Sequence, residues 1–308
     1  MQALITKYRP KSLDEVIGQA SVVSSLRGAI KKKSSRAFLF VGPSGCGKTT
    51  LARILAADVG CAARDVLEID AATHTGIDNI RLVTGGVDYR PMEGGSKIVI
   101  IDEAHALSKA AFQALLKAIE DPPSWAYWAL CTTEETKLPQ TVVTRCTKYS
   151  LKPVEFDDLV GLLDVVVGKE SMDIDEAVID LCAKEASGSP RQALSNLAVC
   201  AEAKDIKEAK ELLRSAIESE EAINLARALV KRASWSEVQA ILAGFKDISP
   251  ESIRHVVRAY VTKVILGSKR EADAGNGLEI LDAFSTPFHP SDGMSPVVLA
   301  CGRIILAA

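Results

Sequence analysis

Residues 37–49 read Ala37-Phe38-Leu39-Phe40-Val41-Gly42-Pro43-Ser44-Gly45-Cys46-Gly47-Lys48-Thr49. Five mostly apolar residues precede a segment of the form G-x-x-x-x-G-K-T, and an apolar run at 51–57 that suits a helix follows it. Strand, loop and helix in this order are what a phosphate-binding loop requires. Its glycines let the backbone turn sharply, so that N–H groups and a helix N-terminus approach a polyphosphate. The alternative is a glycine-rich turn that matches by chance.

The phosphate-binding loop predicts ligand contacts along its whole length. The expected set is Gly42, Pro43, Ser44, Gly45, Cys46, Gly47, Lys48, Thr49 and Thr50. Within this set, Lys48 is expected to reach the β- and γ-phosphates, and the Thr49 hydroxyl is expected to bind Mg²⁺.

A second motif lies about fifty residues further on, where the apolar run at 98–101 ends in Asp102-Glu103. An uninterrupted apolar run suits a strand that is buried on both faces of a parallel sheet, and ligands bind at the carboxyl edge of such sheets. We expect Asp102 to hold Mg²⁺, directly or through water, and Glu103 to polarise the water that attacks the γ-phosphate. The alternative is that the two acids only end a strand.

The composition sets limits on the class of protein. The 308 residues suit two or three domains, and 37 Lys+Arg against 40 Asp+Glu give a net charge of −3, without the basic excess of a general nucleic-acid binder. None of the seven cysteines forms a C-x-x-C pair, so a zinc ribbon is not expected. No apolar stretch reaches about 18 residues, so no membrane partner is expected. The run Lys31-Lys32-Lys33 is interpreted as a solvated helix end.

Strands and helices alternate in the first half of the chain. Apolar runs predict strands at 37–41, 66–70, 97–103, 125–133 and 147–151, and helical spacing predicts helices at 20–33, 109–120, 155–169, 174–186 and 190–202. Alternating strands and helices indicate an α/β fold with a parallel sheet. The pattern changes at Lys152-Pro153, and residues 205–308 read as helix throughout.

Five further segments carry specific motifs. They are Lys7-Tyr8-Arg9-Pro10, Val16-Ile17-Gly18-Gln19, residues 101–108, residues 114–123 and Thr144-Arg145-Cys146. With the phosphate-binding loop they resemble the clamp-loader ATPases of the AAA+ group, such as the gamma/tau subunit of bacterial DNA polymerase III and the small subunits of replication factor C. The resemblance is strong over 5–200. It implies an AAA+ domain with a five-stranded parallel sheet at 1–152, a helical lid at 153–203 and an all-α collar for oligomerisation at 204–308.

The resemblance assigns roles to residues outside the two first motifs. Those expected to line the adenine pocket are Tyr8, Arg9, Val16 and Ile17. Thr133 would be sensor 1, with Thr132 as its close rival, and Arg191 would be sensor 2 and contact the γ-phosphate from the lid. Arg145 would be an arginine finger that serves the nucleotide of the neighbouring subunit. Local alternatives are a surface residue at a helix start for Arg191 and a salt-bridge partner for Arg145.

The function implied by the resemblance is that of an ATPase subunit of a sliding-clamp loader, with ATP and Mg²⁺ as cofactors. ATP binding would assemble the spiral and open the clamp, and primer–template DNA would trigger hydrolysis and clamp release. The implied partners are the clamp, further loader subunits in a pentameric spiral, DNA and a DNA polymerase. The implied location is the cytoplasm, at the replisome, and residues 75–81 match the region that holds DNA phosphates.

The sequence also departs from the pattern. Thr144 replaces the usual serine of the finger motif, and Cys61 alone stands where bacterial gamma/tau chains carry a four-cysteine zinc module. We therefore expect a streamlined or phage-encoded loader, located in the host cytoplasm in the second case. Two alternatives remain. One is another AAA+ DNA motor, such as a Holliday-junction helicase or a fork-maintenance ATPase, and the other is a non-hydrolysing scaffold subunit.

Overall fold

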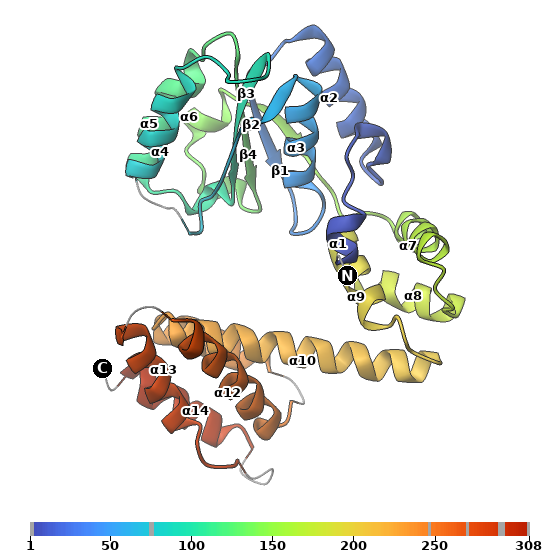
Figure 1. The fold of residues 1–308 in the computed structure, drawn as a ribbon, viewed down its shortest axis with the longest axis vertical. Helices are drawn as coiled ribbons and strands as arrows, with labels where there is room; N and C mark the ends of the chain where they lie inside the picture. The colour runs from blue at the N-terminus through green and yellow to red at the C-terminus, as the bar shows by residue number, and fades with distance from the viewer. Residues whose placement is uncertain (1–2, 74–76, 246–247, 269–270, 289–292, 307–308) are drawn as a thin grey trace. The chain divides into compact units, whose positions relative to one another are not determined.

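Two compact units make up the chain, residues 1–206 and residues 207–308. The computed structural model describes residues 3–73, 77–245, 248–268, 271–288 and 293–306, and Figure 1 labels the helices and strands. Each unit has a hydrophobic core of its own.

A parallel sheet forms the centre of the first unit. Its strands are β1 (Ala37–Val41), β2 (Cys61–Asp70), β3 (Ser96–Asp102), β4 (Ala126–Thr132) and β5 (Thr147–Ser150). The order across the sheet is β2-β3-β4-β1-β5, and every neighbouring pair is parallel. The predicted α/β fold with a five-stranded parallel sheet is thereby confirmed. All five carboxyl ends meet at one edge, so β1 and β3 bring their motifs to the same side.

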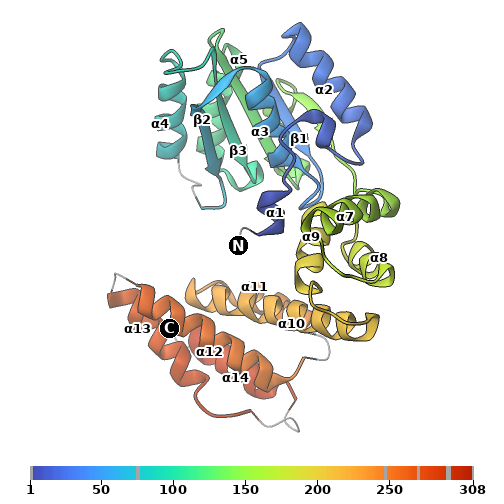
Figure 2. The ribbon, with the colours of Figure 1, turned by 45° about the vertical axis from the view of Figure 1, so that its right-hand side comes forward.

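Helices cover both faces of the sheet (Figure 2). Alternate strand residues point to opposite faces. Phe38 and Ile98 therefore pack with α2 (Ala20–Lys32) and α3 (Lys48–Asp58) on one face, in a core that includes Leu26 and Leu51. On the other face, residues such as Leu39 pack with α4 (Ile77–Val87), α5 (Lys109–Glu120) and α6 (Gln140–Val143). Burial on both faces explains why these strands read as uninterrupted apolar runs.

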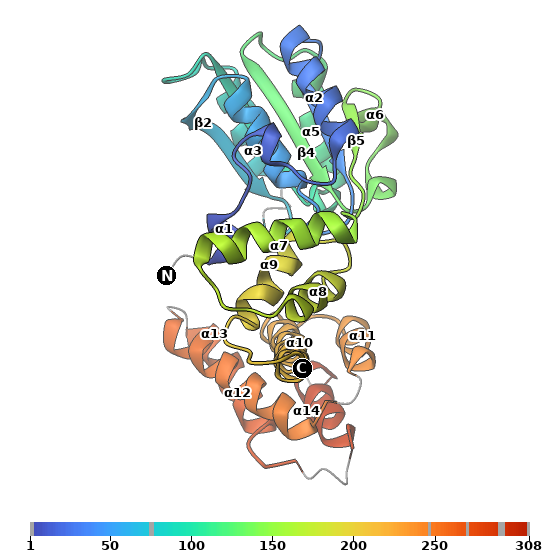
Figure 3. The ribbon, with the colours of Figure 1, turned by 90° about the vertical axis from the view of Figure 1, so that its right-hand side faces the viewer.

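The remaining helices of the first unit are short or belong to a three-helix bundle. They are α1 (Leu4–Lys7), the 3₁₀ turns η1 (Leu13–Glu15), η2 (Ala104–Ala106) and η3 (Glu135–Lys137), and the bundle α7 (Phe156–Glu170), α8 (Glu176–Glu185) and α9 (Pro190–Val199). Figure 3 shows the bundle from the side. Among the described residues of this unit, side-chain caps begin three helices: Ser108 accepts a bond from the Ala111 amide, Asp175 from Ala177 and Ser189 from Gln192.

A short link joins β5 to the bundle and is held on both sides. Gln19 is buried, its Nε2 donates to the Lys152 carbonyl at 2.7 Å, and its Oε1 accepts from the Lys152 amide at 3.3 Å. The Val154 amide donates to the Gly188 carbonyl at 2.9 Å. These bonds fix where the bundle begins relative to the sheet.

In its described residues, the second unit consists of helices and the loops that connect them. Its helices are α10 (Ile206–Val230), α11 (Trp235–Gly244), α12 (Pro250–Gly267), α13 (Glu271–Ala283) and α14 (Ser295–Leu306). Its core contains Leu229, Val257 and Phe284. The guanidinium of Arg254 is largely buried and donates to both oxygens of Glu251, which lowers the pKa of Glu251 to about 2.

The predicted elements agree with the observed ones, with one main difference. The helix at 109–120 has the predicted bounds, but β2 begins at Cys61 rather than at 66. The early part of β2 pairs with β3 through a register shift between Cys61 and Val66, which breaks the apolar pattern in the sequence. In the described part of the chain, no helix has the length and hydrophobicity needed to cross a membrane.

Candidate nucleotide-binding site

The predicted phosphate-binding loop forms the turn between β1 and α3. Gly47 takes φ = +104° and precedes the first residue of α3, and Gly45 takes φ = +76°. Lys48 is almost fully buried, and its ammonium donates to the Gly42 and Pro43 carbonyls, at 2.9 Å each. The loop therefore curls around a lysine ammonium at a helix N-terminus, an arrangement that suits a polyphosphate.

The helical bundle reaches this loop through the start of α9. A Cβ placed on Gly45 would lie 2.0 Å from the Ser189 hydroxyl and 3.3 Å from the Arg191 Cβ. The Cys46 thiol is buried beneath the loop, 3.7 Å from the Gly188 carbonyl, and burial raises its pKa, so it acts as a packing group. The structure thus brings Arg191 next to the loop with an exposed side chain.

The two residues predicted to bind Mg²⁺ meet at the carboxyl edge of the sheet. The Thr49 hydroxyl donates to Asp102 Oδ2 at 2.7 Å, although the residues are 53 positions apart. A hydroxyl and a carboxylate beside a phosphate-binding loop form an oxygen donor set that fits Mg²⁺, which takes its other ligands from phosphates and water. The described residues contain no cluster of three or more His, Cys, Asp or Glu ligands, and this kind of site needs none.

Glu103 follows Asp102 in a strained conformation. Its φ is +48°, in the left-handed region that non-glycine residues rarely adopt. Its amide donates to Asp102 Oδ1 at 3.1 Å, and its side chain is about one-third exposed (35%). Strain of this kind persists where the surrounding structure fixes the residue, and it is common at functional sites.

The end of β4 carries the two sensor candidates. Thr132 is the last residue of the strand and is fully buried, and its hydroxyl accepts a bond from the Glu134 amide at 3.0 Å. Thr133 follows with an exposed side chain. The predicted sensor 1, Thr133, is thus accessible to a ligand, whereas its rival Thr132 belongs to the supporting hydrogen-bond network.

Two of the residues predicted for the adenine pocket lie beside the bundle. The Tyr8 hydroxyl donates to Glu170 at the end of α7, and the Lys7 ammonium pairs with the same carboxylate at 2.6 Å. Burial lowers the pKa of Arg9, and the nearby cations Arg53 and Arg191 lower it further. Arg9 and Arg191 therefore lie near one another at the loop.

The other two residues predicted for the adenine pocket are half-buried just before α2. Val16 packs against the core of α2 and α3. Ile17 is also half-buried, and Gly18 follows with φ = +67°. A Cβ on Gly18 would lie 2.7 Å from a Val154 methyl group, so this turn sits directly on the link to the bundle.

Arg145 lies on the surface and makes its contacts with α5 and α6 rather than with the phosphate-binding loop of the same chain. Its guanidinium donates to Glu120 at the end of α5 at 2.8 Å and to the Thr141 carbonyl at 2.9 Å. The local alternative, a salt bridge, is therefore real. It does not conflict with a role toward another subunit, because a pair this exposed is worth about 0–1 kcal/mol and can exchange partners.

Sequence reasoning missed two groups near the site. Arg53 makes a bidentate pair with Glu68 of β2, at 2.8 and 2.7 Å, and it stands one helical turn after Thr49. The spacing of four residues, which places Arg53 on the same helix face as Thr49, could have indicated from the sequence that Arg53 lies near the site. The second is His105, which contacts both Glu103 and Thr132. For the segment expected to hold DNA, residues 74–76 lie outside the described residues, and Arg81 is exposed on α4.

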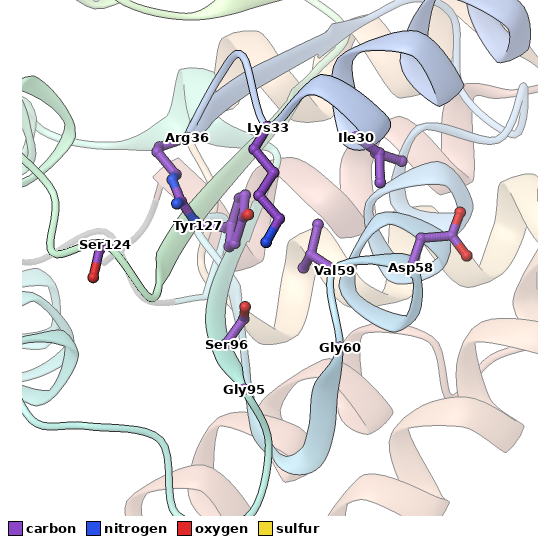
Figure 4. A pocket seen from close by; sticks show the side chains of 10 residues that line it. All are labelled: Ile30, Lys33, Arg36, Asp58, Val59, Gly60, Gly95, Ser96, Ser124 and Tyr127. Atoms are coloured by element: carbon purple, nitrogen blue, oxygen red, sulfur yellow. The ribbon is translucent and has the colours of Figure 1, made fainter.

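A cavity of about 340 Å³ lies at the opposite, amino edge of the sheet (Figure 4). Its polar lining includes Lys33, Arg36 and Ser96, and the Arg36 guanidinium lies over the Tyr127 ring at 4.4 Å. Because the strands run parallel, this cavity is separated from the phosphate-binding loop by the full length of the sheet. It is not part of the candidate nucleotide site.

Comparisons with known proteins extend this picture. A family model described as "DNA polymerase III, delta subunit" matches residues 62–155. The chain is 37% identical to the DNA polymerase III subunit tau of Bacillus subtilis, over 64% of this chain and 39% of the relative. It is 28% identical to the subunit tau of Escherichia coli, over 91% of this chain and 48% of the relative. It is 32% identical to the subunit gamma of Buchnera aphidicola, over 62% of this chain and 58% of the relative. The chain thus covers about half the length of these relatives.

Among solved structures, the fold is similar to RuvB of Thermotoga maritima. The structure titled as a Holliday junction branch migration motor gives a TM-score of 0.56 at 20% identity and covers 82% of this chain and 85% of that one. A single-residue variant of RuvB gives a TM-score of 0.57 at 19% identity and covers 88% of this chain and 94% of that one. At this identity the likeness shows the fold alone. The chain therefore has the AAA+ fold and is related in sequence to the tau and gamma subunits of DNA polymerase III, as its motifs indicate.

Proposed function

We propose that this chain is an ATP-hydrolysing subunit of a sliding-clamp loader. The observation that carries the proposal is the bond between Thr49 and Asp102, which joins the phosphate-binding loop to the acidic end of β3. The sequence relationship to tau and gamma subunits of DNA polymerase III supports the setting in DNA replication. ATP binding would assemble the subunit spiral and open the clamp, and primer–template DNA would trigger hydrolysis and release.

The proposed chemistry is phosphoryl transfer from ATP to water. Lys48 would leave the loop carbonyls to neutralise the β- and γ-phosphates, and Thr49 and Asp102 would hold Mg²⁺, which neutralises developing charge when bound. Glu103 would orient the attacking water.

Three residues would contact a γ-phosphate. Thr133 would contact it from the end of β4, and Arg191 would contact it from the start of α9. Arg145 would contact the nucleotide of the neighbouring subunit, because its guanidinium lies on the surface with α5 and α6 rather than at its own loop. An arginine supplied in trans can raise the rate by about 10³–10⁵.

The first unit also exposes apolar side chains around α4. Leu82 is 79% exposed, and Tyr89 and Met92 are each 75% exposed. Large apolar side chains that are exposed to solvent suit a protein partner. In our proposal the partners are the sliding clamp, further loader subunits in a pentameric spiral, primer–template DNA and a DNA polymerase.

The proposed organisation follows the predicted domains, with nucleotide binding at 1–152, a lid at 153–203 and a collar for oligomerisation at 204–308. The link at Lys152–Val154 supports the first boundary, because β5 ends before it and α7 begins after it. We propose that the protein acts at the replisome in the cytoplasm. If the loader is phage-encoded, this would be the cytoplasm of the infected host.

The proposal is tested with Glu103→Gln in the full chain and its native assembly. Because the amide cannot polarise water, ATP should still bind while DNA-stimulated turnover falls by at least about 10². Glu185→Gln, an exposed change at the end of α8, is the control and should leave turnover unchanged. Normal turnover by Glu103→Gln would contradict the proposal.

A second candidate is the DNA motor that the sequence left open, and the fold shared with RuvB does not separate it from a clamp-loader subunit. The sequence relationship points to the replication subunits instead. A clamp-loading assay and a strand-displacement assay, run on the same complex, separate the two. A non-hydrolysing scaffold, the third possibility, predicts no turnover in either assay.

A further inference from the structure

His105 lies between the proposed catalytic carboxylate and the end of β4. After Glu103, the chain makes the 3₁₀ turn η2 and brings the His105 ring back to the neighbouring strand. The ring nitrogen Nδ1 is 3.0 Å from the Thr132 hydroxyl oxygen and 3.4 Å from Glu103 Oε2. The other nitrogen, Nε2, is 3.5 Å from a carboxylate oxygen of Glu134. One side chain therefore touches three polar groups from two strand ends.

The contact between His105 and Glu103 matters because one oxygen of the Glu103 carboxylate lacks a hydrogen-bond donor. Its Oε2 is buried and, among the described residues, receives no hydrogen bond. A buried carboxylate oxygen without a donor is destabilising, so it gains from a small approach to the Nδ1 of His105.

The ring can satisfy its neighbours in two ways. When the Thr132 hydroxyl donates to Nδ1, this nitrogen has no proton to offer Glu103. When both nitrogens carry protons, Nδ1–H faces Glu103 and Thr132 while Nε2–H faces Glu134. The ring thus lies between the carboxylates of Glu103 and Glu134, and Lys137 pairs with Glu134 at 2.8 Å.

We propose that His105 is a positioning residue that ties the Glu103 carboxylate to the turn after β4, so that the state of this turn sets where Glu103 points. Thr132 and Glu134 flank Thr133, the proposed γ-phosphate contact, and the Glu134 amide donates to the Thr132 hydroxyl. A shift of this turn would therefore reach Glu103 through one imidazole ring. The contact with the ring keeps the carboxylate in a fixed orientation from which it can hold the attacking water. This inference rests on the proposed ATPase function.

The test compares His105→Ala and His105→Asn with the parent chain in its native assembly. His105→Ala should lower kcat about tenfold or more, because Glu103 loses its fixed orientation, and should leave the KM for ATP within about twofold. His105→Asn keeps a donor near the Nδ1 position and should recover part of kcat. The thermal unfolding midpoint shows whether the alanine variant folds normally. If it does not, His105→Asn still tests the role of the ring.

The split between kcat and KM, with partial rescue by His105→Asn, is a readout that a purely structural role would not give. The control His255→Asn removes a largely exposed histidine on α12 and should keep the parental kcat and KM.

The outcomes separate this inference from the proposed function. If Glu103→Gln retains normal turnover, the proposed function itself fails. If Glu103→Gln is inactive but both His105 variants keep the parental kcat, only the role of His105 is overturned. In the double variant, His105→Ala should add no loss to that of Glu103→Gln, because the ring acts through this carboxylate. Additive losses would also contradict the proposal.

Discussion

A single buried carboxylate, Asp65, organises the loop that precedes β3. It is fully buried, and its oxygens accept bonds from three consecutive amides, those of Met92, Glu93 and Gly94, at 2.6, 3.0 and 2.8 Å. Burial alone would raise the pKa of Asp65, but the three backbone amides outweigh it and lower the pKa. The ionised form therefore stabilises the fold.

We predict that Asp65→Asn lowers the free energy of unfolding at pH 7 by about 3 kcal/mol, because an amide cannot accept all three bonds. Since the folded-state pKa of Asp65 is lowered, its contribution is fully present above the unfolded value of about 3.9. It is lost as the pH falls through the lower folded-state pKa. Urea unfolding of parent and variant from about pH 7 down to about pH 3 measures this, and the difference should shrink below about pH 4.

The matched control is Glu93→Gln in the same loop. The Glu93 side chain is half-exposed and pairs with Arg64 at 3.1 Å, so its loss should cost less than about 1 kcal/mol. Equal effects of the two variants, or an Asp65→Asn effect that is independent of pH, would show that the amide bonds do not stabilise the loop.

At the scale of elements, the contact between the helical bundle and the sheet depends on glycines. Gly188 takes φ = +83°, and a Cβ there would lie 2.4 Å from the Pro153 Cβ. Gly60 takes nearly the same conformation, φ = +80°, with nothing within 4 Å of its Cβ position. The two positions share the backbone strain that an L side chain would suffer but differ in available space.

We predict that Gly60→Ala costs about 1 kcal/mol of folding free energy, from the left-handed conformation alone. Gly188→Ala should cost clearly more and should weaken ATP binding several-fold, because the clash with Pro153 moves the start of α9 from the phosphate-binding loop. Chemical unfolding and a fluorescent ATP analogue measure the two effects. Identical behaviour of both variants would indicate that the link tolerates the added methyl group.

At the scale of the whole molecule, the proposed active site is incomplete in one chain. Lys48, Thr49, Asp102 and Glu103 meet at one sheet edge, whereas Arg145 is held by Glu120 on the surface. An assembly in which each chain offers Arg145 to its neighbour would make hydrolysis depend on correct assembly.

We predict that Arg145→Ala leaves the ATP affinity of the isolated chain unchanged and lowers turnover of the assembly by about 10³ or more. Glu120→Gln removes only the local partner of Arg145 and should retain turnover. Assemblies that mix Arg145→Ala with Lys48→Ala chains test the placement in trans, since each active interface needs both residues from different chains. A loss of ATP affinity in isolated Arg145→Ala would instead show a role at its own loop.

Prediction from sequence succeeded where a short segment determines its own structure. The loop at 42–49, the helix at 109–120 and the buried strand predicted at 97–103 and observed at 96–102 depend on local chemistry, and each has the expected structure. It was less exact for β2, where Asp65 and a register shift interrupt the apolar pattern. It also missed His105 and Arg53, whose partners lie on other elements.

The sequence by itself determined the AAA+ fold and the chemistry at the two strand ends, because glycine spacing and apolar runs act over a few residues. The tertiary structure decided which groups meet. The strand order brings Thr49 to Asp102 and His105 to Thr132, and the link at Gln19 and Lys152 brings the start of α9 to Gly45. Such contacts depend on packing between elements distant in the chain, which local residue patterns do not encode.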